Sequence, residues 1–220
     1  MAISFNAGGA GNNAAATNTV SWTHTCTGSN LILLVYASQG GSTTMDITGI
    51  TYNGVALTNI NNFSESSSGS NTSIWYLLSP ATGSQTIIVT SGTARVLRGI
   101  SVSYTGVKQS GQPDASTSNS DIPTATSYTK STTTIADNCW VVIGGRTATG
   151  ALITASTNVT KRQGGSESDF FIVGDTNAVV SPAGAVSQTI NFASSTKSEV
   201  GTVSIAPAVA ALTRSYGFIY

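Results

Sequence analysis

The sequence predicts an all-β protein, a jelly-roll-like antiparallel β-sandwich built from two sequence-similar halves. Residues Asn30–Ser38 hold about seven apolar residues between turn-forming ones, a run too short to span a membrane and apolar on both faces. Residues 19–27 alternate strictly between apolar and polar side chains, as a half-buried strand does. No segment before residue 207 has a helical period. The first run is therefore expected to be the central strand of a sheet that is covered on both faces.

The other elements of the first half follow from the same patterns. Residues 3–5 begin a strand, and the glycine-rich residues 7–13 predict a loop. Asn53-Gly54 stands between two apolar runs and predicts a tight hairpin, because a type I′ turn needs positive φ at both central residues. The polar residues 61–71 predict an exposed loop. Further strands are expected at 47–52, 55–57, 73–78, 85–90 and 97–104.

The second half of the chain repeats the first. Ser187-Gln-Thr-Ile190 is identical to Ser84-Gln-Thr-Ile87, and the similar stretches come in the same order in both halves. The other similar pairs are Asn138–Gly145 with Asn30–Ala37, Ser181–Gly184 with Ser79–Thr82, and Gly201–Ala206 with Gly99–Tyr104. Each half is therefore expected to form the same set of strands.

The repeat also sets the expected domain organisation. A sandwich over residues 1–206 would consist of a first half at about 1–107, a polar linker at 108–122 and a second half at about 123–206. An aromatic tail at 207–220 would follow it. The halves either form two separate sandwiches or give strands to both sheets of one larger sandwich. We favour one sandwich, because the halves are short.

The composition limits the possible partners. Charged residues make up 8% of the chain and the net charge is zero, against an average near 25% charged residues. Nine scattered basic residues cannot form a dense positive face, which disfavours nucleic acid and anionic membranes as partners. The first residues show no lysine, arginine or apolar core of a secretory signal. The uncharged surface gives little colloidal repulsion and fits a protein fixed in an assembly or placed outside the cytoplasm.

Two cysteines, Cys26 and Cys139, lie on expected strands. They either form a disulfide in an oxidising compartment or remain buried as free thiols, and their spacing fits no zinc pattern. We favour two free thiols, because an unpaired buried cysteine behaves as a small apolar residue.

The sequence offers little material for catalysis. His24 is the only histidine and shares a strand face with Trp22 and Cys26, so it is expected to be a buried structural residue. Glu167 and Asp169, followed by Asp175, have the residue types of a glycosidase pair or of a calcium site. A solvated loop edge is the expected role of these carboxylates. No catalytic residue, metal site or cofactor is predicted.

Carbohydrate binding would need a flat aromatic platform beside amide and hydroxyl groups. Trp75 and Tyr76 are the candidate rings for such a glycan platform, with Tyr52 and Trp140 as further possibilities and residues 61–71 as a binding rim. All three tryptophans lie in apolar strands, however, so we expect their rings to fill the core.

The tail differs from the rest of the chain. It places Tyr216, Phe218, Ile219 and Tyr220 in its last residues, where chains usually fray. Burying three aromatic rings and an isoleucine removes on the order of 600 Å² of apolar surface, worth roughly 10 kcal/mol before ordering costs. The tail is therefore expected to be buried, either as a last strand on its own sandwich or as an arm in a neighbouring subunit.

Five stretches share the pattern of a known family in the same order: Val20-Ser-Trp-Thr-His24, Gly28–Val35, Ile50–Leu57, Trp75–Gly83 and Val102–Val107. This succession resembles a widespread, poorly characterised β-sandwich domain of bacteriophage structural proteins and bacterial surface proteins. The resemblance covers roughly residues 3–206. Its motifs are turns and core strands, so it implies the sandwich fold and assigns no catalytic residue.

These observations lead to an expected function. The leading hypothesis is a non-enzymatic virion protein, a capsid decoration or head-fibre component of a tailed phage, that assembles with copies of itself and with a capsid protein. The alternative is a carbohydrate-binding module that recognises a host-surface glycan from a cell-surface or tail-fibre protein. A third hypothesis is a glycosidase that uses Glu167 and Asp169.

Overall fold

The computed structural model describes residues 1–13, 15–42, 44–65, 69–147, 153–164 and 171–209. These residues form strands and no helix. A helix of the length and apolarity that a membrane crossing requires is thus not found in this part of the chain. The strands are β1 (Ser4–Asn12), β2 (Thr17–Cys26), β3 (Ile32–Gly40), β4 (Ile47–Tyr52), β5 (Val55–Ala56), β6 (Thr58–Glu65), β7 (Ser70–Leu78), β8 (Gly83–Thr105), β9 (Ala115–Thr133), β10 (Trp140–Thr147), β11 (Ile153–Thr157), β12 (Thr160–Gly164), β13 (Phe171–Asp175) and β14 (Ala185–Ile205).

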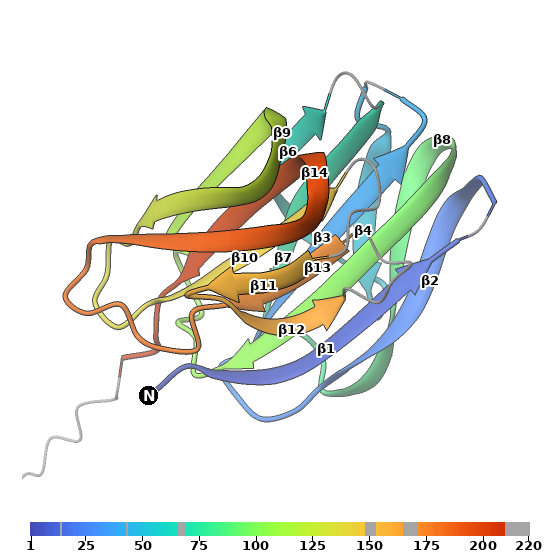
Figure 1. Cartoon of the computed structure of the whole chain (residues 1–220). Helices are drawn as coiled ribbons and strands as arrows, with labels where there is room; N and C mark the ends of the chain where they lie inside the picture. The colour runs from blue at the N-terminus through green and yellow to red at the C-terminus, as the bar shows by residue number, and fades with distance from the viewer. Residues whose placement is uncertain (14, 43, 66–68, 148–152, 165–170, 210–220) are drawn as a thin grey trace, which may run out of the picture.

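Two antiparallel sheets pack as a β-sandwich, which confirms the predicted fold class (Figure 1). The first sheet has the strand order β5-β4-β8-β3-β7-β6, and β1 and β2 also pair with β8. The second has the order β11-β14-β10-β13-β12, and β9 pairs with β14. The first half of the chain thus forms one sheet and the second half forms the other.

The long strands β8 and β14 give both halves the same plan. Residues 83–91 of β8 pair with β2 and β4, whereas residues 96–105 pair with β1 and β3. In the same way, residues 185–192 of β14 pair with the end of β9 and with β11, and residues 198–205 pair with β10. Figure 1 shows β8 and β14 bending between these two parts. Each half is therefore a folded-over sheet with an inner and an outer part.

Strand β3 lies in the middle of the molecule, as its apolar run predicts. Ile32, Leu34 and Tyr36 face a core that also contains Trp140 and Val142 of the second half. The alternate residues, such as Leu33 and Val35, face a second core against β2, β4 and the first part of β8. A strand has to be apolar on both faces when both are covered, and β3 is buried from Ile32 to Gln39.

The turns before the matching strands support the repeat. Asn30 and Asn138 precede β3 and β10, and both have positive φ, at 51° and 62°. The predicted hairpin at Asn53-Gly54 is confirmed, with φ of 50° and 77° between β4 and β5. Asparagine and glycine accept this left-handed region at low cost.

Two predicted loops are strands instead. Residues 7–13 continue β1 as far as Asn12, and Gly11 lies against the Trp22 ring: a Cβ at Gly11, or at its β8 partner Gly99, would overlap that ring. Residues 61–71 largely belong to β6 and β7, which pair with each other. Glycine-rich and asparagine-rich segments indicate loops from sequence, and here tertiary packing overrides that preference.

The predicted linker also ends early. Strand β9 begins at Ala115 and pairs with the last part of β14, so only the first part of 108–122 connects the halves. Serine- and threonine-rich residues 115–118 lack the apolar alternation that would have marked a strand. Of the tail, residues 207–209 are described, and Pro207 forms a bridge with Val107.

Candidate interaction site

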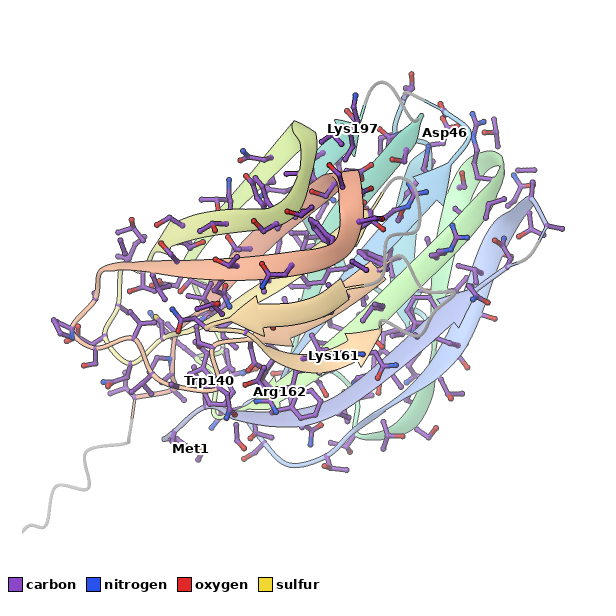
Figure 2. All side chains as sticks on the ribbon, in the orientation of Figure 1. Met1, Asp46, Trp140, Lys161, Arg162 and Lys197 are labelled. Atoms are coloured by element: carbon purple, nitrogen blue, oxygen red, sulfur yellow. The ribbon has the colours of Figure 1, made fainter. Side chains whose placement is uncertain are left out.

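One end of the sandwich carries a groove with a volume of about 700 Å³. We call it the terminal groove. Its lining comes from five segments that are far apart in sequence: residues 1–3, residues between Lys108 and Asp114, residues 135–138, Val179 and residues 206–209. Figure 2 places Met1 at this end of the molecule, opposite the end that carries Asp46. The volume is in the range of pockets that hold a small ligand or a few side chains, ~300–1,000 Å³.

Exposed apolar side chains gather in this groove. Met1, Ile135, Val179 and Val209 expose 60%, 76%, 52% and 85% of their surface. Of the large apolar side chains that the described residues expose, the two others, Val55 and Ile88, do not line the groove. Single exposed apolar residues are ordinary, but a group of them around a concavity marks an interaction site.

The walls of the groove are held by the chain ends. Ala208 donates its backbone N–H to the Gly106 carbonyl at 2.8 Å, and the Met1 ammonium donates to the Ala208 carbonyl at 2.8 Å. The side chain of Gln112 bonds both backbone groups of Ala206, at 3.2 and 3.3 Å. The segment after β14 is thereby fixed against the start of the chain as far as Ala208.

The opposite wall is fixed by Asp114. Its carboxylate accepts the backbone N–H groups of Ile135 and Ala136 at 2.8 and 3.0 Å, and the Ser204 hydroxyl at 3.0 Å. This clamp orients the loop before β10 so that the Ile135 side chain projects into solvent. The groove is therefore a built surface rather than an accident of one side chain.

The charged groups of the groove lie at its rim. Lys108 and Asp137 are both exposed. One carboxylate oxygen of Asp137, Oδ1, accepts the backbone N–H of Ala183 at 2.6 Å. The nearby Cys139 is buried, which raises the pKa of its thiol to about 11. The thiol is protonated at neutral pH and is a poor nucleophile.

The described residues do not gather three or more histidine, cysteine or acidic side chains where a metal could bind. Cys26 is buried like Cys139, and both are free. The terminal groove therefore offers apolar contacts with a few polar groups at the rim, which is the chemistry of a docking surface.

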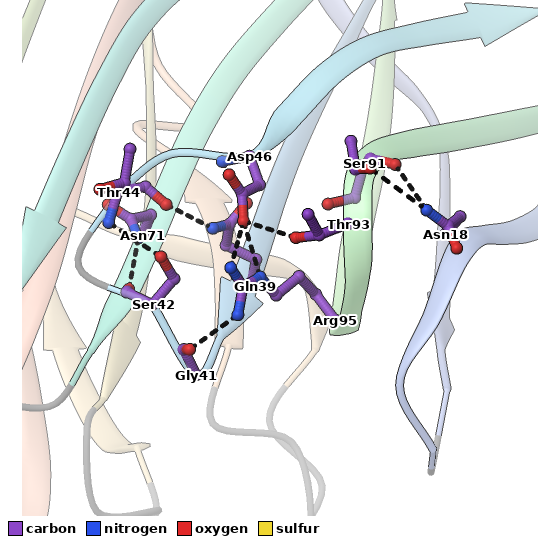
Figure 3. Close-up of polar contacts among 11 residues, drawn as sticks. Asn18, Gln39, Gly41, Ser42, Thr44, Asp46, Asn71, Ser91, Thr93 and Arg95 are labelled. Carbon is purple, nitrogen blue, oxygen red and sulfur yellow. Dashed lines mark hydrogen bonds and ion pairs between the residues drawn. The ribbon is translucent and has the colours of Figure 1, made fainter.

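The opposite end of the molecule carries a polar cluster, shown in Figure 3. Asp46 Oδ2 accepts hydrogen bonds from Arg95 Nε at 2.7 Å and from Thr93 Oγ1 at 2.8 Å. The hydrogen bonds from Thr93 and Arg95 lower the pKa of Asp46. Gln39 bonds the Thr44 carbonyl and the Asp46 N–H, both at 2.8 Å. These groups bind one another and fix the loop before β4 to the bend of β8, so they act as a structural clamp.

His24 is structural, as its strand face predicts. It is 2% exposed, and its Nδ1 and Nε2 each lie 2.9 Å from a serine oxygen, those of Ser101 and Ser103. Burial lowers the pKa of His24 to about 4. Trp22 Nε1 donates to the same Ser101 hydroxyl at 2.9 Å. The ring is therefore neutral at pH 7 and is enclosed in the core of the first half.

The candidate glycan platform is not formed as a pair. Trp75 and Tyr76 are neighbours on β7 and so point to opposite faces of the sheet. Trp75 packs against the core between β3 and β2, and Tyr76 against the core shared by the halves. Trp75 Nε1 also donates to Ser73 Oγ at 2.8 Å. Two rings on opposite faces cannot stack on one sugar.

The carboxylates considered for catalysis give no catalytic pair among the described residues. Glu167 and Asp169 lie outside the described residues. Asp175 is fully buried and forms an ion pair with Arg162, with Nε and Oδ2 2.7 Å apart. Tyr104 Oη of the first half donates to the same oxygen at 2.8 Å. Asp175 therefore joins the two halves and is not presented to a substrate.

Sequence reasoning did not find the terminal groove. The predicted tail contacts Tyr216, Phe218, Ile219 and Tyr220 lie outside the described residues, so they stay a prediction. Ile135, between the polar residues 131–134 and Ala136-Asp137, is the one lining residue whose isolated apolar character could have drawn attention.

No protein-family model, curated protein or solved structure matches the chain.

Proposed function

We propose that the protein is a non-enzymatic structural component of a virus particle, a capsid decoration or head-fibre protein of a tailed phage. It would act as a homo-oligomer that also contacts a capsid protein. The observation that supports this best is the terminal groove, where four exposed apolar side chains surround a cavity of about 700 Å³. An apolar concavity on a surface rich in hydroxyl and amide groups favours association with another protein.

The charge balance supports the same proposal. Nine basic and nine acidic residues give zero net charge over 220 residues. A chain of this kind has little electrostatic repulsion between its copies, which promotes association. The resemblance of residues 3–206 to a sandwich domain of bacteriophage structural proteins and bacterial surface proteins supports a virus particle as one of two settings.

The burial of four potentially reactive side chains also favours a non-enzymatic role. His24, Cys26, Cys139 and Asp175 are each at most 2% exposed, and catalysis needs such groups within reach of a substrate. The His24 ring contacts serines, and Asp175 contacts Tyr104 and Arg162.

Two measurements test the proposal. Light scattering over a range of concentrations should give the mass of a discrete oligomer of the full chain. Mass spectrometry of purified particles from the phage that encodes the chain should find its peptides in many copies per particle. A monomer at every concentration, together with particles that lack the protein, would contradict the proposal.

A further inference from the structure

The terminal groove has a shape and chemistry that call for an apolar segment. Ile135, Val179 and Val209 line it and are more than half exposed. Its volume of about 700 Å³ suits a few large side chains rather than a folded domain. An occupant should therefore be a short chain segment with aromatic or branched residues.

The chain itself contains one such segment. Residues 210–220 read Ala-Ala-Leu-Thr-Arg-Ser-Tyr-Gly-Phe-Ile-Tyr and begin directly after Val209, on the groove wall. Three aromatic rings bury ~150–250 Å² each when they are enclosed. In the described part of the chain no other face gathers exposed apolar residues around a cavity of this size.

The path of the chain bears on whether the groove binds residues 210–220 of its own copy or those of another copy. Ala208 is hydrogen-bonded to Gly106 and to Met1, and residues 206–209 form one wall of the groove. To enter its own groove, the chain would have to reverse soon after Val209. Residues 210–215 contain no glycine, proline, asparagine or aspartate, and Ser215 at their end is the one residue of a type that dominates tight turns. Six residues can span up to ~20 Å, which is enough for Tyr216 to reach the groove of a neighbouring copy.

One charged group of the groove offers a partner for the segment. Arg214 is the only charged side chain in residues 210–220, and it stands two positions before Tyr216. The exposed Asp137 lies at the groove rim, beside the apolar Ile135. A segment that places Tyr216 and Phe218 in the groove can bring Arg214 to that carboxylate, which would help to fix its direction.

From these observations we infer that the terminal groove binds residues 210–220 of a second copy of the chain, with Tyr216, Phe218 and Ile219 as the apolar anchors. The inference rests on the proposed assembly and names its contact. Each copy has one segment and one groove, so a reciprocal exchange gives a two-fold dimer, and a head-to-tail exchange gives a ring when the rotation between copies closes.

Substitution in the groove tests the contact. The double variant Ile135→Ser, Val179→Ser removes two exposed apolar side chains, so its far-UV circular dichroism and melting temperature should stay those of the wild type. Its association should weaken at least about tenfold in light scattering. The matched control is Val55→Ser, because Val55 is 53% exposed outside the groove. Unchanged association of the double variant would overturn the inference.

A cross-linking experiment identifies the copy that supplies the segment. Photoreactive benzoylphenylalanine replaces Phe218 in chains of natural isotope abundance, called light. These are mixed and co-assembled with wild-type chains that carry heavy isotopes. The inference predicts cross-links from light tails to heavy peptides that contain Ile135 or Val179. Cross-links found only within one light chain would overturn it. An oligomer whose cross-links fall elsewhere would also overturn it and leave the proposed assembly standing, whereas a chain that is always monomeric would refute the proposed assembly itself.

Discussion

The two halves of the molecule share one plan but differ in how much they bury. In the first half, the outer part of the sheet and β3 enclose a large core that includes Trp22, Leu33 and Tyr52. In the second half, the described core between the outer part of the sheet and β10 is smaller, with Ile143, Ile190 and Phe192 among its members. Among the described residues, a repeated sequence pattern thus gives the same strand order with cores of different size.

The difference suggests that the two halves depend to different extents on the core that they share. The first half has its own core, whereas the second half depends more on the core that it shares with the first. That shared core contains Tyr36 and Tyr104 of the first half and Trp140 and Val203 of the second. Tyr36 Oη also donates to the Val142 carbonyl at 3.3 Å. We therefore expect the halves to unfold together and the outer part of the second half to open first.

Breaking the tie between the halves should have the largest effect. Asp175→Ala leaves the Arg162 guanidinium and the buried Tyr104 hydroxyl without their shared acceptor. Loss of one partner of a buried ion pair lowers the free energy of unfolding by about 3–5 kcal/mol. Urea unfolding of the variant and the wild type measures this loss. The matched control is Asp46→Ala in the half-exposed pair with Arg95, which should cost less stability because solvent screens that pair. Equal effects of the two variants would contradict the role of Asp175.

The identical tetrapeptides allow a direct comparison of the two cores. Ile87 is fully buried in the larger core, and Ile190 is 1% exposed in the smaller one. Ile87→Ala should cost about 3–4 kcal/mol and Ile190→Ala about 2 kcal/mol, because a smaller core collapses more easily around a cavity. Urea unfolding of the two variants measures the difference. A larger loss for Ile190→Ala would reverse our ranking of the halves.

Acid should weaken the first half through His24. Its pKa is about 4 in the folded chain and ~6.5 when unfolded, so the unfolded state binds more protons between these values. Stability therefore falls as pH drops from 6.5 toward 4, by about 2 kcal/mol at pH 5. Urea unfolding at pH 7 and pH 5 measures this loss. His24→Gln should reduce the loss of unfolding free energy between pH 7 and pH 5. An unchanged loss in this variant would show that other groups cause the pH dependence.

A smaller change tests the hydrogen bond between Tyr104 and Asp175 separately from the ion pair. Tyr104→Phe removes the hydroxyl that donates to Asp175 and keeps the ring in the shared core. Asp175 retains its ion pair with Arg162, so the expected loss is about 1–2 kcal/mol. Thermal unfolding should show this as a small downward shift in the melting temperature. A loss as large as that of Asp175→Ala would mean that the tyrosine, not the arginine, holds the carboxylate.

Much of the fold could be predicted because local patterns decide it. The apolar runs place β3 and β10, and Asn53-Gly54 places a hairpin. The glycines of β1 could not be read as a strand, because the reason for them is the Trp22 ring that packs across Gly11 and Gly99. Only the folded chain brings that ring to them.

The terminal groove was beyond prediction for a similar reason. Its apolar residues Met1, Ile135, Val179 and Val209 come from segments with no shared period or motif. The sequence did mark residues 216–220 as apolar residues in need of cover, and the proposed contact would cover them in the terminal groove. Periodicity finds the strands of a core, but a surface assembled at the end of a sandwich depends on which loops meet there.

The central claim is that copies of the chain join through the terminal groove and residues 210–220. The most direct measurement is the solution mass of the full chain beside a version that ends at Val209, by light scattering at matched concentrations. The shorter version keeps β1 to β14, and far-UV circular dichroism can verify its fold. We predict an oligomer for the full chain and a monomer for the shorter one. The same mass for both would contradict the account.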